Sequence, residues 1–138
     1  MASGARLGSA VMFVQSLDRS VSFYQDVLGL EVADRSATAA LLVSDEGAQL
    51  VLRALGTNAE HALGSVGIQY VIWTAGGDEA VRQAEQALRA RSALLGTRAS
   101  GQVTVVEGRD PDDIVVMIAH PGPDQALLAG LPAWIYGW

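Results

Sequence analysis

The stretch VMFVQSLDRSVSFYQDVLGLEV, residues 11–32, decides the fold. It opens on an apolar, β-branched and aromatic run, and such a run predicts a strand over Ser9–Gln15. Behind it, apolar residues recur at the spacing of one helical face, at Leu17, Val21, Tyr24 and Leu28. The stretch therefore predicts a strand followed directly by an amphipathic helix.

The residues around this helix supply its ends and continue the pattern. Ser16 or Asp18 can cap its start, and Gly29 stands where a glycine with positive φ ends a helix. Three short strands are predicted next, separated by turns at 34–36 and 44–47, over Leu30–Ala33, Ala37–Val43 and Gln49–Ala54. Residues 9–54 thus form a predicted β-α-β-β-β module, followed by a linker over residues 55–66.

The same order returns over residues 67–120. A strand is predicted at Gly67–Thr74 and a helix at Asp78–Arg91 with Asp78 as its N-cap, then strands at Leu94–Arg98, Val103–Glu107 and Ile114–Ala119. Aligning the two halves places Val11 on Val71 and Phe13 on Trp73, and Val51 on Met117 once the longer loops of the second half are allowed for. We interpret this as an internal duplication. An ordinary α+β domain with two amphipathic helices is the alternative.

Composition bounds the possible functions. The 138 residues are the usual length of a single domain, spanning 1–138 here, and half of them are apolar, which is enough for a core. The absence of Cys and Lys excludes thiolate and Schiff-base chemistry. A net charge of −6 argues against nucleic acid as a partner. No run approaches the roughly 20 apolar residues of a membrane span, so we expect a cytoplasmic protein.

The faces of the strands predict a cavity. Ser9, Val11 and Phe13 alternate with apolar neighbours in the first strand, so both faces of this strand are apolar, and the strand before the second helix follows the same pattern. One face packs on the module's own helix and the other must be covered. Two curved sheets that face one another would enclose a cavity there.

Three motifs resemble the vicinal oxygen chelate superfamily, which holds glyoxalase I, extradiol dioxygenases, and fosfomycin- and bleomycin-resistance proteins. They are the stretch at 11–32, the segment QYVIWTAGGDEAVRQAEQALRARSALL at 69–95, and RDPDDIVVMI at 109–118, which is similar to the family's D-P-D-G-N ending. The resemblance implies an α+β fold in which two tandem βαβββ modules form a cup-shaped mixed sheet around a cavity, as a homodimer. Within this last motif, Asp113 stands in place of the family's glycine, and Asp is a residue type that tolerates positive φ.

The resemblance also implies four metal ligands, at the positions of Ser9, Val51, Gln69 and Met117 in this chain. Of these side chains only Gln69 is even a weak oxygen donor for a divalent cation. We therefore predict that the family's metal site is absent, and we expect no cofactor.

Strand parity then predicts which side chains line the cavity. If Ser9 and Gln69 point inward, the predicted ligand-binding residues are Ser9, Val11, Phe13, Val51, Arg53, Gln69, Val71, Trp73, Val115 and Met117. A mostly apolar wall with a few polar points is typical of small-molecule sites. The alternative is that these side chains fill the space between sheets as core. Arg53 either meets a ligand group or reaches solvent.

No catalytic residue is assigned. His61 falls in the linker, and His120 falls on the opposite face from Met117. The acids of the turn at 110–113 are expected to be solvated. Acid or base chemistry by Glu107, Tyr24 or His120 stays open, because catalytic groups meet in space rather than in sequence.

The last segment, residues 121–138, carries four large apolar side chains close together, at Trp134, Ile135, Tyr136 and Trp138. This segment would cover the chain's own pocket, dock on a partner subunit, or be disordered.

Three functions follow. The first is metal-independent binding of a hydrophobic or aromatic small molecule, a class that includes antibiotics. The second is an enzyme of the family, a lyase, isomerase or dioxygenase relative, acting on a small organic substrate. The third is a degenerate dimeric scaffold.

Overall fold

The structure is a computed structural model that describes residues 4–5, 7–60, 66, 68, 70–100 and 102–121. The chain divides into two compact units, unit 1 over Met1–Ala59 and unit 2 over Glu60–Trp138, and each is described by itself. Within the described residues, neither helix has the length and apolar character needed to cross a membrane.

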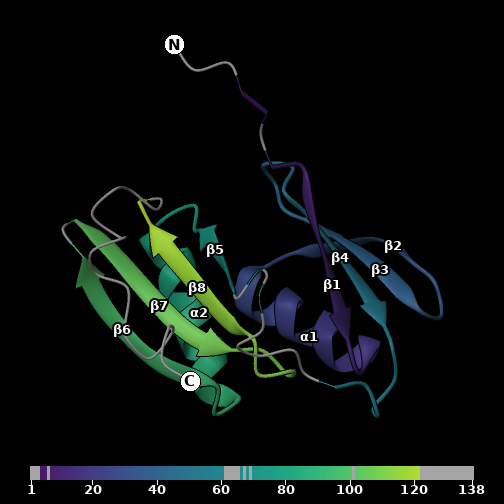
Figure 1. The fold of residues 1–138 in the computed structure, drawn as a ribbon. Coiled ribbons are helices and arrows are strands. Elements are labelled where there is room, and N and C mark those ends of the chain that lie inside the picture. Colours follow the sequence, from purple (N-terminus) through teal and green to yellow (C-terminus); the bar gives the residue numbers. More distant parts are fainter. Residues whose placement is uncertain are drawn as a thin grey trace. The chain divides into compact units, whose positions relative to one another are not determined.

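Unit 1 is a four-stranded sheet with one helix packed across it (Figure 1). The strand order is β1-β4-β3-β2, with β1 and β4 parallel and the other pairs antiparallel. The elements are β1 (Ser9–Val14), α1 (Leu17–Leu28), β2 (Glu31–Arg35), β3 (Ala39–Val43) and β4 (Gln49–Ala54). The predicted β-α-β-β-β order is confirmed. The predicted turn at 34–36 begins too early, because a bulge near Ala33 lets β2 continue to Arg35.

Helix α1 starts and stops where its sequence predicts. The Ser16 hydroxyl accepts a hydrogen bond from the Arg19 backbone N–H at 3.4 Å, and Gly29 ends the helix with φ of 66°. On the buried side, the rings of Phe23 and Tyr24 meet edge to face, with centroids 5.0 Å apart. These aromatic rings fill the layer between α1 and its sheet.

Unit 2 repeats the arrangement, with the strand order β5-β8-β7-β6 and a parallel β5–β8 pair. Its elements are β5 (Tyr70–Thr74), α2 (Asp78–Ala90), β6 (Leu94–Ser100), β7 (Val103–Arg109) and β8 (Val115–His120). The prediction of Asp78 as N-cap is wrong. Asp78 is already helical, and the cap is Gly77, which has no side chain to accept a hydrogen bond.

In the structure, the first strand and helix of unit 2 align with those of unit 1 at an offset that is one residue larger than the sequence predicts. Helix α1 begins at Leu17 and α2 at Asp78. Val11 pairs with Val51 across β1–β4, and Ile72 pairs with Met117 across β5–β8, so Val11 corresponds to Ile72 rather than to Val71. Because successive side chains of a strand alternate between faces, this difference of one residue places every side chain of β5 on the face opposite to the predicted one.

The turn between β7 and β8 confirms one prediction and corrects another. Asp113 has φ of 65°, as expected for the residue in the glycine position of the motif. Asp110 and Asp112 are not solvated but are 4% and 2% exposed. Asp110 Oδ1 accepts hydrogen bonds from the backbone N–H groups of Asp112 and Ile114, at 2.8 and 3.0 Å, so this carboxylate holds the turn.

Candidate functional site

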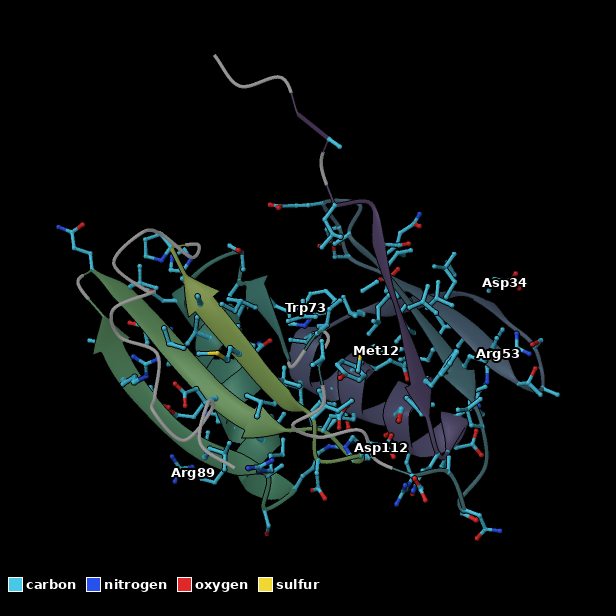
Figure 2. The ribbon with its side chains drawn as sticks, viewed as in Figure 1. Met12, Asp34, Arg53, Trp73, Arg89 and Asp112 are labelled. Carbon is cyan, nitrogen blue, oxygen red and sulfur yellow. The ribbon has the colours of Figure 1, made fainter. Side chains whose placement is uncertain are left out.

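The outer face of each sheet, meaning the face opposite its helix, carries the candidate site. In unit 1 the Tyr24 hydroxyl lies 3.9 Å from Met12 Sδ, which identifies Met12 as belonging to the helix side of β1. Met12 and Arg53, both labelled in Figure 2, therefore belong to opposite faces, because Arg53 pairs with Phe13. The outer face of unit 1 thus takes the alternate residues of β1 and β4: Ser9, Val11, Phe13, Gln49, Val51 and Arg53.

All five residues predicted on these two strands share that face. Val11 and Phe13 are 63% and 61% exposed within the structure, and Arg53 is exposed as well. Arg53 reaches solvent, which leaves its side chain accessible to a ligand group. Whether these residues contact a ligand stays a prediction.

The outer face of unit 2 is buried. Met117, fully buried, forms a cluster with Val103, Val105 and Ala119, against which Ile72 and Val115 pack. Gly108 belongs to the helix side, because a Cβ on it would approach the Leu88 side chain of α2. Gly108 pairs with Val116, so both belong to the helix side. Glu107 and Met117 are the neighbours of these two residues and pair with each other, so both lie on the outer face.

Two predicted wall residues lie on the wrong face. Val71 and Trp73 pair with Val116 and Ile118, which places both on the helix side of the sheet rather than beside Met117 (Figure 2 labels Trp73). The prediction that they share a face with Val115 and Met117 is wrong because it aligned Val11 with Val71 instead of Ile72. The helix starts show the correct alignment only in the structure, since the N-caps Ser16 and Gly77 are one position further apart than Val11 and Val71, whereas the sequence predicts Asp78 as the second cap.

Three predictions fall outside the described residues: those on Gln69, on His61 and on the apolar segment beyond Pro121. Register places Tyr70, not Gln69, at the backbone position of unit 2 that corresponds to Ser9, because Tyr70 and Ser9 each lie two residues before the paired positions Ile72 and Val11.

An ion pair on the outer face of unit 2 was not predicted as a site. Arg98 Nε donates a hydrogen bond to Glu107 Oε1 at 2.7 Å, and the Glu107 side chain is only 6% exposed. A buried carboxylate is costly unless it is paired, and Arg98 supplies the partner. The signal available in the sequence was Glu107 alone, an acid directly after the apolar pair Val105 and Val106.

His120 does not join this pair. Its Nδ1 lies 3.1 Å from the Ala75 carbonyl oxygen, and its Nε2 lies 3.8 Å from Asp78 Oδ1. These contacts tie the end of β8 to the start of α2. By register His120 pairs with Thr104 on the helix side, opposite Met117, as predicted.

Comparison with known proteins identifies the family. The sequence model of the glyoxalase/bleomycin resistance protein/dioxygenase superfamily matches residues 6–118. The chain belongs to this superfamily. The vicinal oxygen chelate resemblance drawn from the three motifs is thereby confirmed, together with the α+β fold of two βαβββ units. No curated protein matches the sequence.

Solved structures of the superfamily share the fold at low identity. A glyoxylase/bleomycin resistance protein/dioxygenase domain from Frankia sp. EAN1pec has a TM-score of 0.73 at 19% identity, covering 85% of this chain and 98% of that one. A lactoylglutathione lyase from Agrobacterium tumefaciens has 0.64 at 18%, covering 85% and 94%. The oxidase ChaP-H1 has 0.68 at 17%, covering 86% and 98%. At such identities these likenesses establish the fold and not the activity.

The donor chemistry does not fit the metal that the superfamily resemblance implies. Val51 and Met117 hold the central positions of the outer faces, paired with Val11 and Ile72, and neither side chain is a ligand for a hard divalent cation. Within the described part of the chain, no three His, Asp or Glu side chains are close enough together to hold an ion.

Proposed function

We propose that this protein binds a hydrophobic or aromatic small molecule, a class that includes antibiotics, without using a metal ion. The observation that carries the proposal is the pair Val51 and Met117. They occupy corresponding places at the centres of the two outer faces, where the superfamily resemblance puts metal ligands. An apolar side chain there favours contact with an apolar ligand over coordination of a substrate oxygen through a cation.

The exposed side chains of unit 1 support this proposal. Val11 and Phe13 are large, apolar and more than half exposed on one face of one strand. Exposed apolar residues that are contiguous, rather than scattered, mark binding surfaces. Phe13 offers a ring for stacking on a planar ligand, and Ser9 and Arg53 supply polar groups at the ends of the same face.

The test is titration with N-phenyl-1-naphthylamine, a neutral aromatic fluorophore whose emission rises when it leaves water. We expect saturable binding that EDTA leaves unchanged, and a metal content well below one ion per chain. Phe13→Ser removes the exposed ring and is expected to weaken binding about tenfold. Leu55→Ser is the matched control, because Leu55 is also an exposed apolar residue of unit 1, at 52%, but follows the end of β4.

Two results contradict the proposal. One is a tightly held divalent ion whose removal abolishes binding of the fluorophore. The other is equal affinity in Phe13→Ser and Leu55→Ser, which would remove the outer face of unit 1 from the site.

An enzyme acting on a small organic substrate is the second candidate, and buried Glu107 favours it. A carboxylate held in apolar surroundings on the outer face is a candidate acid or base. Mass spectrometry of a bound compound after prolonged incubation tests this function, and turnover that Glu107→Gln abolishes would promote the enzyme over the binding protein. The cytoplasmic, homodimeric setting stays a prediction, as does a scaffold role.

A further inference from the structure

The Arg98–Glu107 pair leaves one strong donor unused. Arg98 Nε is satisfied by Glu107, but Arg98 Nη2 is buried and has no hydrogen-bond partner among the described residues. A guanidinium N–H that is removed from water without an acceptor costs free energy comparable to a lost hydrogen bond. The arginine side chain as a whole keeps 27% of its surface accessible, and β6 is an edge strand, so the pair lies at the margin of the buried cluster.

Space is available beside the pair. Gly96 is the residue directly opposite Glu107 across β6–β7. A Cβ built on Gly96 would find no heavy atom within 4 Å, and Gly96 has no positive φ that would require glycine. The glycine therefore leaves open volume on the outer face, next to Glu107 and two residues before Arg98.

The apolar surroundings make this volume suited to a ligand with an apolar body. Glu107 pairs with Met117 and Arg98 pairs with Val105, so both partners of the ion pair border the buried cluster. A few polar groups at the margin of an apolar surface are what orients a small molecule in a binding site.

We propose that Arg98, Glu107 and Gly96 form a subsite for a neutral carbonyl oxygen of the ligand, with Arg98 Nη2 as the donor. This inference rests on the proposed binding function and names the polar group carried by a ligand on the outer face of unit 2. A carbonyl rather than a carboxylate is favoured by charge. Glu107 already balances Arg98, and a second anion would add negative charge to a buried site in a chain of net charge −6.

Three probes with one ring system test the subsite. 2-Acetylnaphthalene carries a ketone, 2-ethylnaphthalene has nearly the same shape without an acceptor, and 2-naphthoate carries an anion. Equilibrium dialysis gives the affinity of each probe. The ratio of ketone to ethyl affinity, compared between two protein variants, cancels the different water solubilities of the probes and isolates the hydrogen bond.

The double variant is chosen to avoid leaving a buried charge alone. Arg98→Met/Glu107→Gln removes the donor and the carboxylate together and is expected to lower the ketone-to-ethyl ratio about tenfold. Glu79→Gln/Arg82→Gln is the matched control. It removes another Arg–Glu pair of unit 2, with the same 2.7 Å separation but exposed on α2, and the ratio is expected to stay unchanged.

Two single variants test the parts of the subsite separately. Gly96→Val fills the open volume and is expected to weaken ketone binding about tenfold while the protein still folds, since a Cβ there meets no atom. Glu107→Gln keeps Arg98 and removes its counter-charge, and is expected to raise the affinity for 2-naphthoate about tenfold. Circular dichroism confirms that each variant is folded, and Gly96→Val decides the question if the double variant is not.

The outcomes separate this inference from the proposed function. The subsite is overturned, and the binding function left standing, if both neutral probes bind, the double variant leaves the ketone-to-ethyl ratio unchanged and Gly96→Val leaves the ketone affinity unchanged. An unchanged 2-naphthoate affinity in Glu107→Gln overturns the role of Arg98 as donor. Failure of wild-type protein to bind any of the three probes overturns both proposals.

Discussion

The two units build one topology with different side-chain volumes between helix and sheet. When the helix starts Leu17 and Asp78 are aligned, the buried Phe23 of α1 corresponds to Ala84 of α2. On the sheets, Leu42 of β3 holds the place that Gly108 holds in β7, since the partners of these residues, Leu50 and Val116, correspond across β4 and β8. Unit 2 thus holds the smaller residue at both matched positions, and the Leu88 side chain of α2 lies close to Gly108 in the space that this leaves.

The outer faces differ more than the helix sides. Unit 1 presents Val11 and Phe13 to solvent, whereas unit 2 buries Met117 and an ion pair. A duplicated unit can keep its core pattern because the core specifies the fold. The outer face is free to diverge, and it carries the proposed ligand contact in unit 1 and the proposed carbonyl subsite in unit 2.

The largest expected effect is the difference in stability loss between a buried and an exposed phenylalanine of unit 1. Phe23→Ala leaves a cavity in a site where the ring is 1% exposed and packed edge to face on Tyr24. We expect a loss of about 3–5 kcal/mol in the free energy of unfolding, measured with urea. Phe13→Ala is the control, because the same residue type at 61% exposure should cost less than about 1 kcal/mol. Equal losses would mean that Phe13 is buried in solution and that the outer face is not available to a ligand.

A smaller effect is expected at Gly108, where unit 2 has a smaller residue than unit 1. A Cβ on Gly108 would lie 2.6 Å from Leu88 Cδ2 and 2.9 Å from the Ala93 carbonyl oxygen, which accepts a hydrogen bond from Arg109. Gly108→Ala therefore forces a backbone shift, and we expect it to cost about 1–3 kcal/mol in the same urea measurement.

The control for this prediction is Gly76→Ala, where an added Cβ meets no atom within 4 Å. Its unfolding free energy should stay within about 0.5 kcal/mol of wild type. A destabilisation as large as that of Gly108→Ala would contradict the prediction, because it would show that the loss does not come from the close approach of Leu88.

Much of the fold was predictable because its signals are local. The cap at Ser16, the glycine at Gly29 and the apolar spacing between them are read from adjacent residues, and the structure reproduces all three. The three motifs add the family. Periodicity alone does not define how a strand of one unit aligns with the matching strand of the other. An error of one position in aligning β1 with β5 exchanges the two faces of β5.

The candidate site was therefore only half predictable. The unit 1 residues were found because Ser9, Val11 and Phe13 alternate within a single strand, which needs no alignment. Trp73 was misplaced because its face depends on how β5 pairs with β8. The Arg98–Glu107 pair joins β6 and β7 beyond a bulge between Leu94 and Gly96, and the sequence alone does not show which residues of these two strands lie opposite one another.

The smallest expected effect concerns the two helix starts, which correspond in place and differ in chemistry. Ser16 caps α1 with its hydroxyl, and Ser16→Ala should cost about 1 kcal/mol. Gly77 caps α2 with no side chain, in an extended backbone conformation that any residue adopts, and with open space at its Cβ position. Gly77→Ser should thus stabilise the protein by about 0.5–1 kcal/mol, because the new hydroxyl accepts from a free helix N–H and the unfolded chain loses freedom. Urea unfolding of both variants measures the difference, and a destabilised Gly77→Ser would show that α2 begins in a geometry that a serine hydroxyl cannot cap.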